Sequence, residues 1–231
     1  MARYKYKHTY SWNRDLAYVV GLLASDGCLI GDGRHIDFTS KDRQLVEYYR
    51  LLTKPHIKIG IKRGIEGQEY FRVQLGDVAF YDFLVSVGLC ARKSKVIKSV
   101  DVPDEFYPDF LRGYFDGDGS IYSFWDKRWK NSLMFYTTYT SASDPFLSWM
   151  RKQNIRLVGT GPGSIRPSQR AKSLGYAKKD SRLLFRYMYG DGFVPKLSRK
   201  YERFVDLLEA DPYANQGDIH ARVAKLVAAQ P

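Results

Sequence analysis

One motif occurs twice in this chain, and the duplication limits the folds that the chain can adopt. The stretches "LAYVVGLLASDGCLI" and "FLRGYFDGDGSIY" each run an apolar, helix-like segment into Asp-Gly and then into a strand-like segment. Pairing Asp26 with Asp118 (118 − 26 = 92) also pairs Gly21 with Gly113, so the two copies keep one spacing. Two copies in 231 residues predict a duplicated fold with two similar halves rather than a solenoid.

The segments that follow the two copies also correspond. After the first copy come strand-like RHIDFTS, helix-like KDRQLVEYYRLL, strand-like HIKIGIKRG and YFRVQLG, and helix-like DVAFYDFLVSVG. After the second come LMFYTTYTS, SDPFLSWMRKQN, GSIRPSQR, LGYAKK and DSRLLFRYMYG, in the same order. Each half therefore reads α-β-β-α-β-β-α, which predicts an α+β fold with two pseudo-symmetric halves and antiparallel sheets. We predict a first half at 1–101, a second half at 102–210 and a C-terminal tail at 211–231.

The predicted strands alternate apolar and polar side chains. In HIDFT, Ile36 and Phe38 alternate with His35, Asp37 and Thr39, and the three isoleucines of HIKIGIK share one face. A sheet with one apolar face and one basic, hydrogen-bonding face suits the reading of DNA base edges. An ordinary solvated face would also alternate, but Lys and Glu usually dominate such faces. The Arg, Gln, Thr, His and Tyr found here favour recognition.

Composition indicates which partners and compartments are open to the chain. The net charge of +12 makes a polyanion, such as nucleic acid, the favoured partner. Two cysteines are too few for a disulfide framework or a zinc cluster, and they fit a reducing interior. The longest apolar run, Leu16 to Ala24, is far shorter than the ~20 residues needed to cross a bilayer. The N-terminal stretch also lacks the apolar core of a signal peptide. We expect a soluble intracellular protein, in a compartment that the sequence leaves undetermined.

Each copy of the motif places a carboxylate at a position where it destabilises a helix. Asp26 and Asp118 fall at the C-terminal ends of the predicted motif helices. The helix macrodipole puts partial negative charge at that end, so an acid there is mildly destabilising. A compensating cation is therefore expected close to these two residues.

The motifs "VVGLLASDG" (Val19 to Gly27) and "LRGYFDGDG" (Leu111 to Gly119) resemble the two motifs of a single-chain LAGLIDADG homing endonuclease. The segment FLRGYFDGDGSI is especially typical of that family, and the resemblance runs from residue 13 to about residue 210. It implies a monomer that cleaves both strands of a long, non-palindromic duplex DNA target by metal-dependent phosphodiester hydrolysis. The cofactor implied is Mg²⁺, with Mn²⁺ able to substitute and Ca²⁺ supporting binding without efficient cleavage.

The resemblance also implies which residues form the catalytic centre. The two motif helices would pack closely about a pseudo-two-fold axis and bring Asp26 and Asp118 together to hold Mg²⁺ against the scissile phosphate. The backbone carbonyls of Ser25 and Gly117 would face the metal ions. Asp116, two positions before the motif acid, is expected to serve the helix end instead. The small residues that would allow the close approach are Ala17, Gly21, Ala24, Gly113 and Gly117.

The family keeps a basic residue near each active centre, after the third helix of each half. The matching segments, ARKSKVI and LSRKYERF, indicate Lys93 and Lys200 as the catalytic lysines, with Lys95 and Lys196 as rivals. Such a lysine would stabilise developing negative charge or polarise the attacking water; the alternative roles are phosphate positioning and plain solubility. Some members carry a Gln after the first recognition strand, but this chain has Ser40 and then Lys41 at that place.

The sequence predicts a DNA-contacting surface on both halves. In the first half the candidates are His35, Asp37, Thr39, Ser40, Lys41, Lys58, Lys62, Tyr70, Arg72 and Gln74. In the second half they are Tyr136, Thr138, Thr140, Arg166, Ser168, Arg170, Tyr176 and Lys178.

Two other functions remain open for a chain of this kind: an intron RNA maturase, and a DNA-binding regulator without catalysis. Regulators of this fold typically lose the motif acids, and both are present here.

Overall fold

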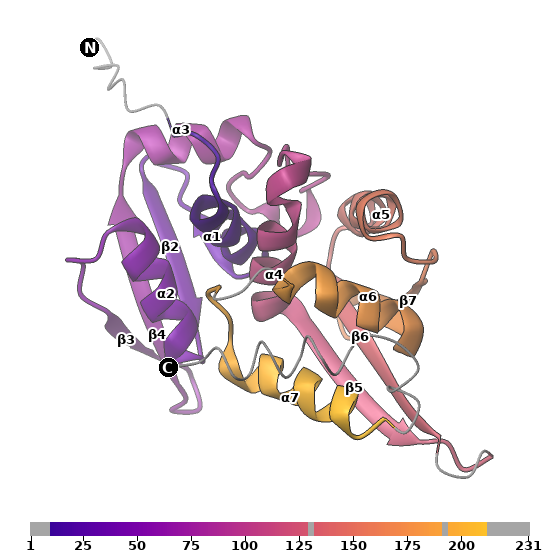
Figure 1. Cartoon of the computed structure of the whole chain (residues 1–231). Helices are drawn as coiled ribbons and strands as arrows, with labels where there is room; N and C mark the ends of the chain where they lie inside the picture. The colour runs from indigo at the N-terminus through magenta and orange to yellow at the C-terminus, as the bar shows by residue number, and fades with distance from the viewer. Residues whose placement is uncertain (1–9, 129–131, 191–193, 212–231) are drawn as a thin grey trace, which may run out of the picture. The chain divides into compact units, whose positions relative to one another are not determined.

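The computed structural model describes residues 10–128, 132–190 and 194–211 (Figure 1). By its internal contacts the chain divides into two compact units, Met1–Gly117 and Asp118–Pro231. The predicted boundary after residue 101 stays a prediction. Most of the predicted C-terminal tail, residues 212–231, lies outside the described residues.

The first unit holds one four-stranded antiparallel sheet in the order β1-β2-β4-β3. Helix α2 lies along β2 and β4 (Figure 1). The helix α4 begins in this unit, and its last residue lies at the boundary between the units. In chain order the elements are α1 (Arg14–Ser25), β1 (Gly27–Leu29), β2 (His35–Ser40), α2 (Arg43–Thr53), β3 (Gly60–Arg63), β4 (Glu69–Gly76), α3 (Val78–Ser86), the short turns η1 (Lys93–Lys95) and η2 (Asp104–Phe106), and α4 (Tyr107–Asp118).

The second unit repeats this arrangement. Its antiparallel sheet has the order β5-β6-β8-β7, and α5 and α6 pack against β6 and β8. The duplicated α+β fold predicted from the repeat is therefore confirmed. The elements are β5 (Gly119–Trp125), β6 (Leu133–Ser141), α5 (Asp144–Gln153), the π-helical turn η3 (Asn154–Val158), β7 (Ser164–Ser168), β8 (Ala171–Ala177), α6 (Lys178–Tyr189) and α7 (Ser198–Glu209).

Helix α1 forms the centre of the first unit. It begins after Asn13, whose side-chain oxygen accepts a hydrogen bond from the backbone N–H of Leu16 at 2.8 Å and so caps the first turn. Every residue from Ala17 to Ala24 is buried. Such a helix is apolar on all sides because other elements surround it. Within the described part of the chain, no helix combines the length and the apolar character needed to span a membrane.

The predicted strand alternation is confirmed in β2 and corrected in β3. Along β2, Ile36 and Phe38 are fully buried, whereas His35, Asp37 and Thr39 are half-exposed. The β3 strand begins only at Gly60, and all four of its residues are exposed. The predicted strand over HIKIGIK is therefore only partly formed: Ile57 and Ile59 precede β3 and are half-buried, whereas Ile61 lies in β3 and is 61% exposed. The strand β3 is an edge strand that pairs with β4.

Candidate functional site

The two motif helices approach each other through glycine. A Cβ on Gly21 of α1 would lie 2.2 Å from the carbonyl oxygen of Phe110 in α4, and a Cβ on Gly113 would lie 2.2 Å from that of Tyr18. Phe110 follows Tyr18 by the same spacing as the motifs (110 − 18 = 92), so the contact is reciprocal. Glycine within a helix costs about 1 kcal/mol relative to Ala. The close backbone approach explains why the chain accepts that cost twice.

Polar contacts also join α1 to α4. The Tyr18 hydroxyl donates to Asp116 Oδ2 at 2.7 Å, and both residues are buried. Asp109 is buried as well, and it accepts from Arg112 at 2.6 Å and from Arg14 Nε at 3.2 Å. The expectation that Asp116 serves the helix end is thus refined, because its carboxylate binds a hydroxyl on the neighbouring helix.

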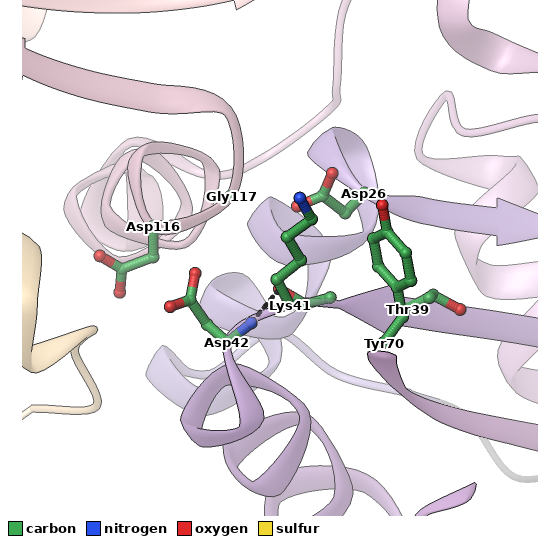
Figure 2. Close-up of a pocket in the computed structure, with 8 residues that line it drawn as sticks. Asp26, Thr39, Lys41, Asp42, Tyr70, Asp116 and Gly117 are labelled. Carbon is green, nitrogen blue, oxygen red and sulfur yellow. Dashed lines mark hydrogen bonds between the residues drawn. The ribbon is translucent and has the colours of Figure 1, made fainter. Parts of the chain in front are cut away.

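A pocket of about 230 Å³ lies beside the C-terminal end of α1. Figure 2 shows the three carboxylates that line it and the Lys41 side chain that extends into it from the end of β2. The Lys41 ammonium lies 5.4 Å from the centre of the Tyr70 ring. The lining residues are Asp26, Thr39, Ser40, Lys41, Asp42, Tyr70, Asp116 and Gly117.

The predicted catalytic residue Asp26 borders this pocket, close to α4. It caps α1, and its backbone N–H bonds to the carbonyl of Leu22 at 3.0 Å. A Cβ on Gly117 would lie 3.1 Å from Asp26 Oδ2 and 2.0 Å from Ser25 Oγ, so only glycine fits at this place in α4. Asp118, the second predicted acid, is the next residue along the chain and the last of α4.

The donor chemistry of this region fits a Mg²⁺ ion. Within residues 10–128, 132–190 and 194–211, no group of three or more His, Cys, Asp and Glu forms a self-sufficient metal site. Mg²⁺ is usually held by one or two carboxylates together with water and substrate phosphate. The Asp26 carboxylate at the pocket offers that kind of ligand. The metal-ligand roles of Asp26, Asp118, Ser25 and Gly117 stay predictions.

The two predicted lysines make matching contacts in the two units. Lys93 is buried, and its ammonium donates to the carbonyl oxygens of Ser25 at 3.0 Å and Gly27 at 2.6 Å. Lys200 is buried too, and its ammonium donates to the carbonyl oxygen of Gly119 at 2.6 Å. Gly27 and Gly119 are the matched glycines that end the two motifs. The rivals differ, since Lys95 is exposed and Lys196 lies 4.0 Å above the Tyr201 ring.

These contacts put positive charge at the end of each motif helix. The Lys93 ammonium binds the last carbonyl of α1, and the Lys200 ammonium binds the carbonyl just after the last residue of α4. A cation there offsets the negative end of the helix dipole. The expected compensating charge therefore comes from the chain itself, and the dipole alone does not require a metal ion.

The exposed face of the first sheet carries an ion pair. Arg72 Nε donates to Asp37 Oδ2 at 2.6 Å, and the Thr39 hydroxyl donates to Asp37 Oδ1 at 3.1 Å. Tyr70 and Gln74 each lie two positions from Arg72 along β4 and so share its face; Gln74 is exposed between the buried residues Val73 and Leu75. Of the two predicted lysines, Lys62 lies in β3 and Lys58 in the exposed segment before it; His35 is half-exposed on β2.

Ser40 does not lie on this exposed face. It falls in the buried alternation of β2 with 9% of its surface exposed, and its hydroxyl oxygen accepts from the backbone N–H of Asp42 at 3.1 Å. Ser40 therefore lies off the half-exposed face of β2 and borders the pocket instead, and its predicted DNA contact stays a prediction. A small serine can end a buried strand while it supports the start of the next helix.

On the second sheet, part of the predicted surface is in place. Tyr136, Thr138 and Thr140 alternate with buried residues along β6 and are partly exposed. Arg166 and Ser168 are exposed on β7. Arg170 lies in the turn between β7 and β8 with φ of 57°, so its predicted position on a strand is wrong.

The predicted positions of Tyr176 and Lys178 on the polar face of a strand are also wrong. Tyr176 is fully buried in β8; its hydroxyl accepts from Asn154 Nδ2 at 3.1 Å, and burial raises the pKa of the phenol. Lys178 begins α6, where its ammonium donates to the Leu133 carbonyl at 2.9 Å and to Asp211 at 2.6 Å. The β8 strand begins at Ala171, earlier than predicted. The residues of β8 that alternate with the buried Leu174 and Tyr176, such as Ser173, are partly exposed.

The sequence-based list of DNA-contacting residues missed two exposed aromatic residues. Tyr122 and Phe124 lie on β5 next to Tyr136 and are each 47% exposed. The alternation in GSIYSFW, where Ser120, Tyr122 and Phe124 share one face, was the signal that could have found them.

Comparison with protein-family models found no match, and comparison with curated proteins found none either. Solved structures do match. A double mutant of I-SmaMI, a meganuclease, aligns with a TM-score of 0.61 and 14% identity over 92% of this chain and 96% of that chain. The LAGLIDADG homing endonuclease I-GzeII, in complex with its DNA target, aligns with a TM-score of 0.57 and 11% identity over 95% of this chain and 97% of that chain. Full-length DUF199/WhiA from Thermatoga maritima aligns with a TM-score of 0.56 and 16% identity over 96% of this chain and 68% of that chain. The protein therefore has the LAGLIDADG fold.

Proposed function

We propose that this protein is a site-specific endonuclease that cleaves both strands of a long, non-palindromic duplex DNA in a Mg²⁺-dependent reaction. The observation that carries the proposal is the matched lysine contact at the two motif ends. Lys93 binds the carbonyl of Gly27, and Lys200 binds that of Gly119. In both cases the glycine directly follows a motif acid. A chain that keeps both acids and supports both motif ends in the same way has the parts for cutting two strands.

In this proposal Asp26 and Asp118 hold the metal through their carboxylates. When bound, the ion would polarise the scissile phosphate and lower the pKa of an attacking water. Lys93 and Lys200 fix the backbone that carries the two acids, so that each carboxylate keeps its direction. Their ammonium groups also place positive charge near the site, where negative charge develops during phosphodiester cleavage.

DNA binding follows from charge and from the exposed sheet faces. The net charge of +12 favours contact with phosphates at any sequence. The half-exposed face of the first sheet offers Arg72, Gln74 and Thr39 for hydrogen bonds to base edges. Because each half supplies one acid, a monomer would suffice for double-strand cleavage.

The test is incubation of the full chain with a library of long duplexes, including candidate intron-insertion sites, in the presence of Mg²⁺. We expect double-strand breaks at a defined sequence, detected by sequencing the new ends. Parallel incubation in Ca²⁺ reports binding without efficient cleavage. Binding of a defined sequence with no breaks in Mg²⁺ or Mn²⁺ would reject the nuclease and retain DNA recognition.

That last outcome describes the second candidate, a sequence-specific DNA-binding protein without catalysis. It is favoured by one observation: the fold matches DUF199/WhiA over 96% of this chain, with a TM-score close to those of the endonucleases. Fold likeness alone does not separate these two functions.

A further inference from the structure

Three aromatic side chains form a ladder on the second sheet. Tyr122 on β5 pairs with Tyr136 on β6, and their ring centroids lie 5.2 Å apart with 9° between the planes. Phe124 continues the row, with its ring 6.1 Å from that of Tyr136 and 11° between the planes. Tyr122 and Phe124 are each 47% exposed. We call Tyr122, Tyr136 and Phe124 the aromatic ladder.

The ladder shares its face of the sheet with hydroxyl groups. Ser120 and Thr138 hydrogen-bond through their hydroxyls at 2.6 Å, and Thr140 and Ser173 do so at 3.2 Å. The structure describes β5 and β6 along their full lengths, and neither strand places a charged side chain on this face. Phe135 and Tyr139 lie on the opposite, buried face. The exposed face of these two strands is therefore apolar and hydroxylic.

We propose that the aromatic ladder contacts the C5-methyl groups of thymines in the major groove of duplex DNA; this rests on the proposed function. The major-groove edges of the bases carry one apolar group, the thymine methyl. An exposed aromatic row beside hydroxyl groups matches such an edge, which presents a methyl next to hydrogen-bonding atoms. The net charge of +12 supplies the attraction to the phosphates on either side.

The stacking of the rings favours thymine methyl groups over unpaired bases as the ligand of the aromatic ladder. Near-parallel rings at these distances are stacked with an offset, so each ring covers part of its neighbour's face. A base cannot insert between Tyr122 and Tyr136 without separating them, so the ladder offers mainly ring edges to a ligand. Ring edges suit van der Waals contact with a methyl group better than they suit base stacking.

The two halves of the target should therefore differ in the chemistry that is read. The exposed face of the first sheet carries the Arg72–Asp37 ion pair, which suits hydrogen bonding to bases. The exposed face of the second sheet carries the ladder. Burying one methyl group changes affinity by about fourfold. Loss of thymine methyls should weaken binding in one half-site and leave the other half-site unchanged.

The experiment replaces thymine by deoxyuridine, which removes the methyl and keeps the base pair. A preferred duplex is first selected from a randomised library in Ca²⁺. Dissociation constants are then measured for the full chain on duplexes carrying deoxyuridine in one half-site, the other, or both. We expect a loss of about fourfold for each contacted thymine, confined to one half-site.

Variants connect this loss to the ladder. In Phe124→Ala, deoxyuridine should weaken binding less than in the wild type, because a contact is already gone. Tyr136→Phe keeps the ring and should retain the full deoxyuridine effect. Leu51→Ala removes another exposed apolar side chain, on α2, and serves as the matched control. Thermal melting checks that each variant is folded.

The outcomes separate the two proposals. Tight duplex binding that ignores deoxyuridine in both half-sites overturns the ladder assignment and leaves the proposed function intact. Tighter binding to single strands than to duplexes, lost in Phe124→Ala, overturns the assignment in favour of unpaired bases. Failure to bind any duplex rejects the proposed function, and the ladder assignment with it.

Discussion

Arg72 on β4 reaches diagonally across the first sheet to Asp37 on β2, with its Nε 2.6 Å from the Asp37 carboxylate. Of the two side chains, that of Asp37 is the less exposed, at 16% against 37% for Arg72. The hydrogen bond with Asp37 raises the pKa of Arg72 and holds the guanidinium in one direction. A guanidinium carries five N–H groups, so this pairing leaves others available for a guanine edge.

Truncating Arg72 should therefore relax base preference in one half-site only. If Arg72 grips a guanine, Arg72→Ala should cost about 1–3 kcal/mol of binding free energy at that base pair. Asp37→Asn should weaken the same preference, because the guanidinium loses its charged partner. Selection of bound sites from a randomised library measures both effects. The contrast is Lys62→Ala, which should weaken binding at all sequences and make the salt dependence shallower. Relaxation spread over both half-sites would mean that the wrong face of β4 has been assigned.

Removing either motif acid should separate binding from cleavage. We expect Asp26→Asn and Asp118→Asn each to abolish double-strand cleavage in Mg²⁺ while the dissociation constant for DNA changes little. The reason is that the proposed role of these carboxylates is to hold metal, and they contribute little to DNA affinity. A gel assay of cleavage and a binding titration on the same duplex check this. Full cleavage by either variant would contradict the assigned mechanism.

The glycine contact between the motif helices makes a prediction about stability. Gly21→Ala should lower the free energy of unfolding by about 1–3 kcal/mol, because the new Cβ would lie 2.2 Å from the Phe110 carbonyl and force the helices apart. Gly31→Ala is the matched control, since a Cβ there meets nothing within 4 Å. Denaturant titration compares the two variants. Equal stability for both would show that the helices separate at little cost.

The buried lysine makes a second prediction about stability. Lys93→Met keeps an unbranched side chain but removes the ammonium, which leaves the carbonyls of Ser25 and Gly27 without this donor. We expect a loss of about 1–3 kcal/mol in the free energy of unfolding, and a matching fall in cleavage as the end of α1 loosens. The exposed Lys95, changed to Met, should alter neither. If both variants behave alike, the proposed positioning role of Lys93 is lost.

Asp77 gives the protein a predicted dependence on pH. Burial alone raises the pKa of this carboxyl, but the Phe80 N–H, the Lys54 ammonium and the Tyr10 hydroxyl together bring it below its ordinary value. A lowered folded-state pKa stabilises the fold above the unfolded value, near 3.9, and the effect disappears as pH falls through the folded value. Asp77→Asn should be less stable than the wild type at pH 7, and the difference should shrink below about pH 4. Urea titrations at both pH values test this; a gap that stays constant would contradict it.

The sequence by itself determined the architecture of this protein. The repeated motif, with its constant spacing, required two similar halves, and the alternation in HIDFT fixed which side of β2 faces the core. Both signals are local: alternation shows which side of a strand is apolar, and a mid-helix glycine signals close packing before the partner is known. For that reason the close helix packing at Gly21 and Gly113 could be predicted from the sequence. Burial of the apolar side still depends on what covers the strand, as the exposed Ile61 of β3 shows.

Only the tertiary structure decided which polar side chains are buried and which groups they bind. Tyr176 looks exposed in sequence but is buried, because Asn154 supplies a partner for its hydroxyl. Asp116 binds Tyr18 across the two helices, and the ammonium of Lys93 reaches the carbonyl of Gly27, 66 residues earlier and just past the end of α1. A hydrogen bond or ion pair depends on atoms being within about 3 Å, and residues far apart in sequence reach that distance only once the chain has folded.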